Sequence, residues 1–102
     1  MKIPKEFEVM GNTVKVNYDD SLLQSDMFLG KYIARNNEIK ILPNGSSFKR
    51  TKEQIYQTYL HEMVHCILDK MGKHELCDDE EFVDMFANLL LQVEKTKKGE
   101  IK

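Results

Sequence analysis

The chain is poor in cysteine, the residue that could stabilise the fold through disulfide bonds. Its 102 residues include two cysteines, two prolines and no tryptophan. Cys66 and Cys77 are too few for a disulfide framework, and their separation does not form a CxxC pair. We therefore expect a reduced protein whose fold depends on an ordinary hydrophobic core.

The chain also lacks long apolar runs and a large net charge. Its longest apolar stretches, such as Leu89-Leu90-Leu91, are far too short to span a bilayer. Residues 1–6 turn polar at once, unlike a secretory signal. The net charge of −2 gives no bulk attraction to nucleic acid or anionic lipid. We therefore expect a soluble, cytoplasmic protein that binds neither nucleic acid nor membranes.

The first half of the chain has the alternating pattern of strands. Residues 7–10 and 13–16 flank Gly11-Asn12, a pair that accepts the positive φ angles of a tight turn, so they predict a hairpin over 7–18. Residues 28–34 and 38–42 flank Arg35-Asn36-Asn37 and predict a second hairpin. Residues 43–47, which include a proline and a glycine, then interrupt regular structure.

The second half of the chain has the spacing of helices. Thr51 and Gln54 are placed as in a capping box, and apolar residues recur every three or four positions, which predicts a helix over 52–71. Acidic residues 78–81 open a second helix, whose apolar stripe continues to Val93. Residues 96–102 are predicted to be a frayed tail. Residues 1–102 thus predict a single α+β domain with a small antiparallel sheet packed on two main helices.

The segment His61-Glu62-Met63-Val64-His65 lies in the middle of the first predicted helix. Two histidines four positions apart lie on one helix face, within reach of one ion. Glu62 is one step round the helix, where its carboxylate can meet a water molecule bound to that ion. A catalytic zinc site takes three protein ligands and leaves one position for water. We therefore predict that His61 and His65 bind Zn²⁺ and that Glu62 is the general base.

A third ligand is expected on the second helix, where Glu80 and Asp84 share a face. We favour Glu80 as the ligand, and Asp84 would accept a hydrogen bond from the remaining ring N–H of a motif histidine. Glu81 is an alternative ligand, although its spacing from Asp78 resembles a capping box. His74, on the link between the helices, is another candidate ligand and a candidate oxyanion donor. The tyrosines at positions 18, 32, 56 and 59 are further candidate oxyanion donors.

Residues 51–91 resemble the small gluzincin-like metallopeptidases of the ImmA/IrrE type, which occur in bacteria, their phages and mobile elements. The resemblance rests on His61-Glu62-x-x-His65, a short link, and Glu80-x-x-Val83-Asp84-x-Phe86-Ala87-x-x-Leu90. The second helix of that family typically reads Glu-x-x-Ala-Asn-x-Phe-Ala, so the chain departs from it at Val83 and Asp84. The second-helix pattern of thermolysin, Glu-x-x-x-Asp, is similar. Both comparisons imply a zincin-like fold with Glu80 as the third zinc ligand.

The resemblance implies zinc-dependent hydrolysis of a peptide or protein substrate, which in such families is often a regulator. In such folds an edge strand aligns an extended peptide, and residues 38–42 are our candidate strand. The alternative is a metal-stabilised regulatory or binding module with little or no catalytic activity. Glu62 argues against this alternative, because a structural zinc site prefers four protein ligands and needs no base.

Overall fold

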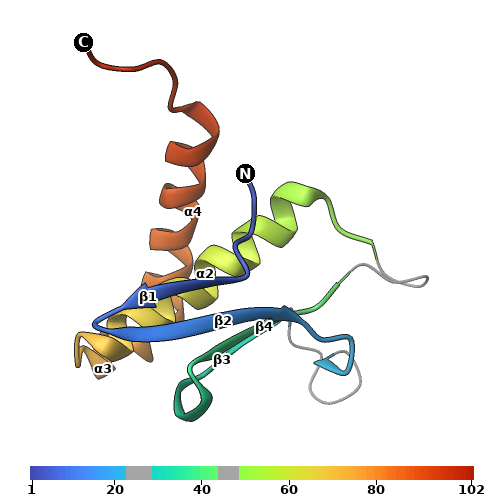
Figure 1. Cartoon of the computed structure of the whole chain (residues 1–102), viewed down its shortest axis with the longest axis vertical. Helices are drawn as coiled ribbons and strands as arrows, with labels where there is room; N and C mark the ends of the chain where they lie inside the picture. Colours follow the sequence, from blue (N-terminus) through green and yellow to red (C-terminus); the bar gives the residue numbers. More distant parts are fainter. Residues whose placement is uncertain (23–28, 44–48) are drawn as a thin grey trace.

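A computed structural model describes residues 1–22, 29–43 and 49–102 of the chain (Figure 1). Residue 28 of the second predicted hairpin and most of the predicted interruption at 43–47 lie outside these ranges. None of the described helices combines the length and the apolar character that are needed to cross a bilayer. The elements, in chain order, are β1 (Glu6–Val9), β2 (Asn12–Tyr18), β3 (Gly30–Ile33), the 3₁₀ turn η1 (Ala34–Asn36), β4 (Glu38–Ile41), α2 (Lys52–Lys70), α3 (His74–Cys77) and α4 (Glu80–Thr96).

The fold is α+β, as predicted, but its sheet is mixed and not antiparallel. The strand order is β1-β2-β4-β3, in which β1–β2 and β3–β4 are antiparallel pairs and β2 runs parallel to β4. Each hairpin is predictable because its turn is local, whereas the pairing between the two hairpins is a long-range contact that alternation does not encode. The strand predicted over 38–42 is therefore an interior strand. The edge strands of the described sheet are β1 and β3.

The first hairpin turns one residue earlier than predicted. Val9 pairs with Asn12, so that Met10 and Gly11 form the turn with φ angles of 51° and 77°. Two successive positive φ angles are typical of the hairpin turn whose twist matches that of the flanking strands. At the second hairpin, Asn37 has a φ of 48°, in agreement with the expected tolerance of asparagine for this conformation.

One hydrophobic cluster joins the sheet to the helices. Its sheet side consists of Val14 and Val16 of β2 and Ile39 and Ile41 of β4, which alternate with more exposed residues as predicted. Helix α2 contacts β3 and β4 as well as α4 (Figure 1). The buried residues of α2 are therefore spread around most of the helix, whereas the fully buried face of α4 is narrow. This makes α2 the central element of the molecule.

Helix α2 begins with the predicted capping box. Thr51 Oγ1 accepts a hydrogen bond from the Gln54 N–H at 3.0 Å, and Gln54 Oε1 accepts one from the Thr51 N–H at 2.8 Å. The predicted cap of α4 is wrong by one residue, because Asp79 rather than Asp78 accepts the Phe82 N–H, at 3.1 Å. The preceding link contains the short helix α3, which the sequence pattern does not predict.

The sheet lies very close to α2 at Gly30, the first residue of β3. A Cβ atom at this position would lie 2.6 Å from Thr58 Cγ2 and 3.1 Å from Glu62 Cγ. A carbon–carbon distance of 2.6 Å is well inside van der Waals contact. Only glycine therefore lets β3 pass α2 at this separation.

We predict that Gly30→Ala lowers the free energy of unfolding by about 1–3 kcal/mol, because the added methyl group forces β3 and α2 apart. Urea denaturation followed by far-UV circular dichroism measures this change. Thr13→Ala, at an exposed position of β2, is the control and should change stability by less than about 0.5 kcal/mol. Equal stability of the two variants would contradict the close approach at Gly30.

Candidate metal centre

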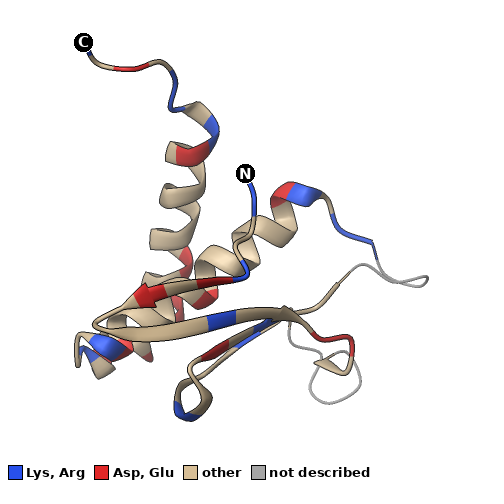
Figure 2. Cartoon of the chain, viewed as in Figure 1, with Lys and Arg blue, Asp and Glu red and all other residues tan. Residues whose placement is uncertain are grey.

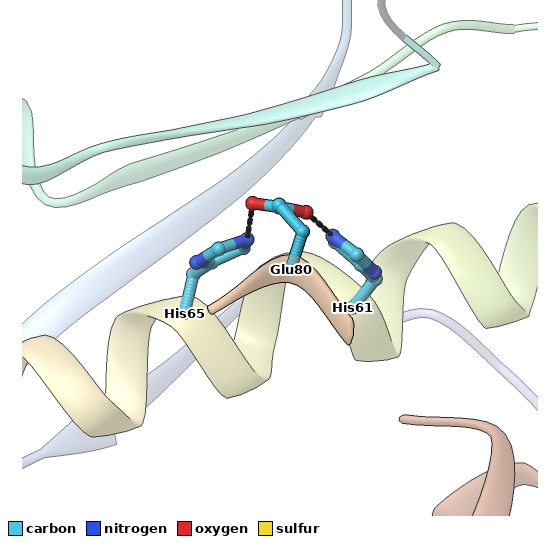
Figure 3. A group of neighbouring side chains, drawn as sticks. All are labelled: His61, His65 and Glu80. Carbon is cyan, nitrogen blue, oxygen red and sulfur yellow. Dashed lines mark hydrogen bonds and ion pairs between the residues drawn. The ribbon is translucent and has the colours of Figure 1, made fainter. Parts of the chain in front are cut away.

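Three side chains from two helices converge at one point. His61 and His65 lie one turn apart on α2, with ring centroids 5.0 Å from each other. Glu80, the first residue of α4, places its carboxylate between the two rings (Figure 3). Its Oε2 atom lies 3.0 Å from His61 Nε2, and its Oε1 atom lies 2.9 Å from His65 Nε2.

These three groups fit a single divalent cation. Their ligand atoms all lie within 4.8 Å of one another, the distance range that one shared ion requires. Ligands held about 2.0–2.1 Å from a tetrahedral zinc ion lie roughly 3.3 Å apart, close to the observed separations between Glu80 and the two imidazoles. His61 and His65 are partly buried, whereas Glu80 is exposed. An ion at this point would therefore be held firmly on the α2 side and be open toward solvent.

Asp84, one turn after Glu80, lies behind His61. Its Oδ1 atom is 3.4 Å from His61 Nδ1, the ring nitrogen that faces away from Glu80. A carboxylate at this nitrogen favours the tautomer in which Nε2 is free to bind a metal ion. Gln57 Nε2 donates to Asp84 Oδ1 at 3.3 Å and thereby helps to orient the carboxylate.

Cys77, the last residue of α3, has the corresponding position behind His65. Its Sγ atom lies 3.6 Å from His65 Nδ1 and donates a hydrogen bond to the His65 carbonyl oxygen at 3.4 Å. This contact depends on the short helix α3, which the sequence pattern does not predict. Each imidazole ring thus has Glu80 at Nε2 and a different side chain at Nδ1.

Glu62 is buried beside this cluster, next to the sheet. Burial raises the pKa of its carboxyl group to about 7, and the charge of Glu80 acts in the same direction. His61 and the backbone N–H of Tyr32, which donates to the Glu62 carboxylate, oppose this increase in pKa. A carboxyl group with such a pKa can take up and release a proton near neutral pH.

A cavity of about 760 Å³ opens over the cluster. One side is formed by residues 29–32, from the start of β3, and the other by α2 and the beginning of α4. The cavity wall includes both histidines, Glu62, Glu80 and Asp84. This size is within the range of small-molecule sites.

The structure does not bring the other predicted residues to the same point. Glu81 is exposed on α4 and borders a different hollow. His74 is exposed on α3, with Nδ1 3.8 Å from Asp69 Oδ1, and is not part of the cavity wall. Of the four candidate tyrosines, Tyr32 lines the cavity, but its hydroxyl group donates to Asp69 Oδ2 at 2.8 Å.

Compared with models of protein families, with curated protein sequences and with solved structures, the chain gives no match.

We predict that Glu80→Ala weakens zinc binding by more than roughly 100-fold, because it removes one of the three candidate ligands. Loss of a residue that only contacts a ligand typically costs roughly 10- to 100-fold. Isothermal titration with Zn²⁺ measures the affinity. The matched control is Glu81→Ala, at the next residue of the same helix, which should bind zinc as the unchanged chain does. Normal zinc binding by the Glu80→Ala variant would show that Glu80 is not the third ligand.

We predict that Cys77→Ala weakens zinc binding about tenfold, because His65 loses the partner at Nδ1 that orients its ring. Cys77→Ser keeps a polar atom at this position and should recover part of the affinity. The same titration, together with the melting temperature of the metal-free variants, separates this effect from a loss of folding. An affinity that is unchanged in both variants would show that His65 does not need this contact.

Proposed function

We propose that the chain is a zinc-dependent peptidase in which His61, His65 and Glu80 bind the metal ion and Glu62 is the general base. The observation that carries this proposal is the convergence of the two imidazoles and the Glu80 carboxylate beside a buried glutamate, at the wall of an open cavity. Metal, base and space for a substrate are the parts that metal-assisted hydrolysis requires.

The donor set supports zinc as the metal ion. Two imidazole nitrogens and one carboxylate oxygen suit zinc, whereas magnesium and calcium prefer oxygen ligands only. Three protein ligands leave a fourth position for water, which is typical of catalytic and not of structural zinc sites. The exposure of Glu80 leaves that position accessible from the cavity.

A bound zinc ion would supply Lewis acidity, which lowers the pKa of a coordinated water molecule and polarises a peptide carbonyl group. The Glu62 carboxylate accepts the proton of the attacking water and then donates it to the leaving amine. The Tyr32 N–H and the close approach of Gly30 keep this carboxylate beside His61. Asp84 and Cys77 hold the two histidine rings in the orientation that presents Nε2 to the cavity.

β3 is an edge strand of the described sheet, and this edge is suited to hold an extended peptide next to these groups. The Leu29 carbonyl oxygen accepts from the Leu42 N–H, so alternation directs the backbone groups of Gly30 and Tyr32 away from β4. The Tyr32 N–H donates to Glu62, which leaves the Gly30 backbone groups and the Tyr32 carbonyl oxygen for a peptide. Residues 29–32 form one side of the cavity, whereas β4 lies inside the sheet. A peptide can therefore add to β3, and not to the strand expected from the sequence.

The resemblance to ImmA/IrrE-type metallopeptidases supports a peptide or protein as the substrate and makes a regulatory protein a suitable candidate. The alternative function, a metal-stabilised binding or regulatory module, leaves the burial of Glu62 without a role. Burial of this carboxyl group costs free energy that the Tyr32 N–H only partly offsets, and carboxyl groups with raised pKa values cluster at functional sites.

We predict that Glu62→Gln lowers the rate of peptide cleavage by roughly 100- to 10,000-fold, because the amide cannot accept a proton. Zinc affinity should stay within a few-fold of that of the unchanged chain, since Glu62 is not a ligand in this proposal. Cleavage of a fluorogenic peptide library by the zinc-loaded protein measures the rate.

The matched control is Glu81→Gln, the same change at an exposed glutamate of α4, and it should retain full activity. If the zinc-loaded, unchanged protein cleaves no member of the library, the peptidase proposal is wrong and the chain is better described as a metal-stabilised binding module. If Glu62→Gln and the unchanged chain cleave equally fast, Glu62 is not the base.

A further inference from the structure

Two rows of polar side chains face each other across the contact between α2 and α4. Each row has three members spaced four residues apart, and the six residues are Gln57, His61 and His65 on α2 and Glu80, Asp84 and Asn88 on α4. The rows run in opposite directions, so that Glu80 contacts the two histidines and Asn88 contacts Gln57. The candidate metal ligands therefore occupy one end of the paired rows, and two uncharged amides occupy the other.

Gln57, Asp84 and Asn88 form a closed ring of three hydrogen bonds. Gln57 Nε2 donates to Asp84 Oδ1 at 3.3 Å and to Asn88 Oδ1 at 3.2 Å, and Asn88 Nδ2 donates to Asp84 Oδ2 at 3.5 Å. Asp84 Oδ1 also lies 3.4 Å from His61 Nδ1, so both oxygen atoms of this carboxylate have a partner. The two N–H bonds of the Gln57 amide match its two acceptors, which fixes the orientation of the amide group.

Asp84 depends on such partners because packing does not hold it in place. Its side chain is 57% exposed, and an exposed carboxylate is otherwise free to adopt several rotamers. Gln57 holds one carboxylate oxygen from α2, and Asn88 holds the other from the next turn of α4. Asn88 is not part of the cavity wall, so an effect of this residue on the metal centre would have to pass through Gln57 and Asp84.

The partners of Asp84 on the two helices are uncharged. Residues 53–69 and 74–94 contain no lysine or arginine, and Figure 2 shows these residues only near the ends of α2 and α4. A lysine or arginine beside Asp84 would also hold the carboxylate, but its charge would compete with His61 and repel a divalent cation. Amide groups hold the carboxylate and leave its negative charge for the imidazole ring.

We propose that Asn88, together with Gln57, is a positioning residue of the metal centre, which holds the Asp84 carboxylate at His61 Nδ1 and thereby strengthens metal binding. This inference rests on the proposed zinc site, but it does not depend on peptidase activity. A carboxylate aligned with Nδ1 fixes the imidazole ring and raises its basicity, so the affinity for zinc is the property that responds.

Isothermal titration of the full chain with Zn²⁺ tests the proposal. Asn88→Ala should weaken binding about three- to tenfold, less than the roughly 10- to 100-fold that loss of a direct partner of a ligand typically costs. The matched control is Gln92→Ala, at an exposed position one turn further along α4, which should bind zinc as the unchanged chain does. Because alanine favours a helix more than asparagine or glutamine, neither substitution should lower the melting temperature of the metal-free chain.

A double-mutant cycle tests whether Asn88 acts through Asp84. In a chain that already carries Asp84→Ala, adding Asn88→Ala should cause no further loss of zinc affinity, because the carboxylate that it positions is gone. An equal loss with and without Asp84, or an unchanged affinity of Asn88→Ala alone, overturns the proposal.

Proton NMR of the Co²⁺-loaded chain gives an independent signature, because paramagnetic Co²⁺ can replace zinc and shifts the ring N–H signals of coordinated histidines out of the crowded spectrum. Asn88→Ala and Asp84→Ala should both speed the exchange with water of the same signal, that of His61. The signal of His65, whose Nδ1 faces Cys77, should not change and is the internal control.

Faster exchange of both signals, or of neither, contradicts the positioning role. A chain that binds neither Zn²⁺ nor Co²⁺ overturns the metal centre and this role together. A chain that binds zinc but cleaves no peptide removes only the peptidase, and the zinc affinities of the variants then still decide the role of Asn88.

Discussion

The packing of α4 against α2 is the contact on which the proposed chemistry depends. His61 and His65 are brought together by the helix that carries them, but they reach a third ligand only if the first turn of α4 lies against the same face of α2. Val83 and Ala87 are buried in this contact, three and seven residues after Glu80. The apolar packing of α4 therefore sets the position of an exposed carboxylate that could not position itself, since an exposed glutamate side chain is otherwise free to move.

The sheet packs on another side of α2 and determines the position of Glu62, as α4 determines that of Glu80. Gly30 allows β3 to approach so closely that Glu62 is enclosed between the strand and its own helix. The same approach places the start of β3, an edge strand of the described sheet, along the cavity. One small residue thus links the burial of the proposed base to the position of the strand that would align a peptide.

Helix α4 combines a buried face and a face toward the histidines. Val83 and Ala87 face the core, whereas Glu80 and Asp84 face the histidines. A helix with 3.6 residues per turn can separate these functions because residues three or four apart share a face, whereas their immediate neighbours do not. The separation explains why Glu80 and Glu81, although adjacent, have such different surroundings.

The sequence by itself determined the α+β class, both hairpins, the capping box of α2 and the histidine pair, and it favoured Glu80 and Asp84. These features are local: alternation, capping and the i, i+4 relation depend on residues within one turn or one hairpin of each other. Only the tertiary structure decided that the sheet is mixed, that β3 and not β4 is an edge strand of the described sheet, and that Cys77 lies at His65 Nδ1. Each of these depends on how segments distant in sequence pack together, and no short-range pattern records the outcome of that packing.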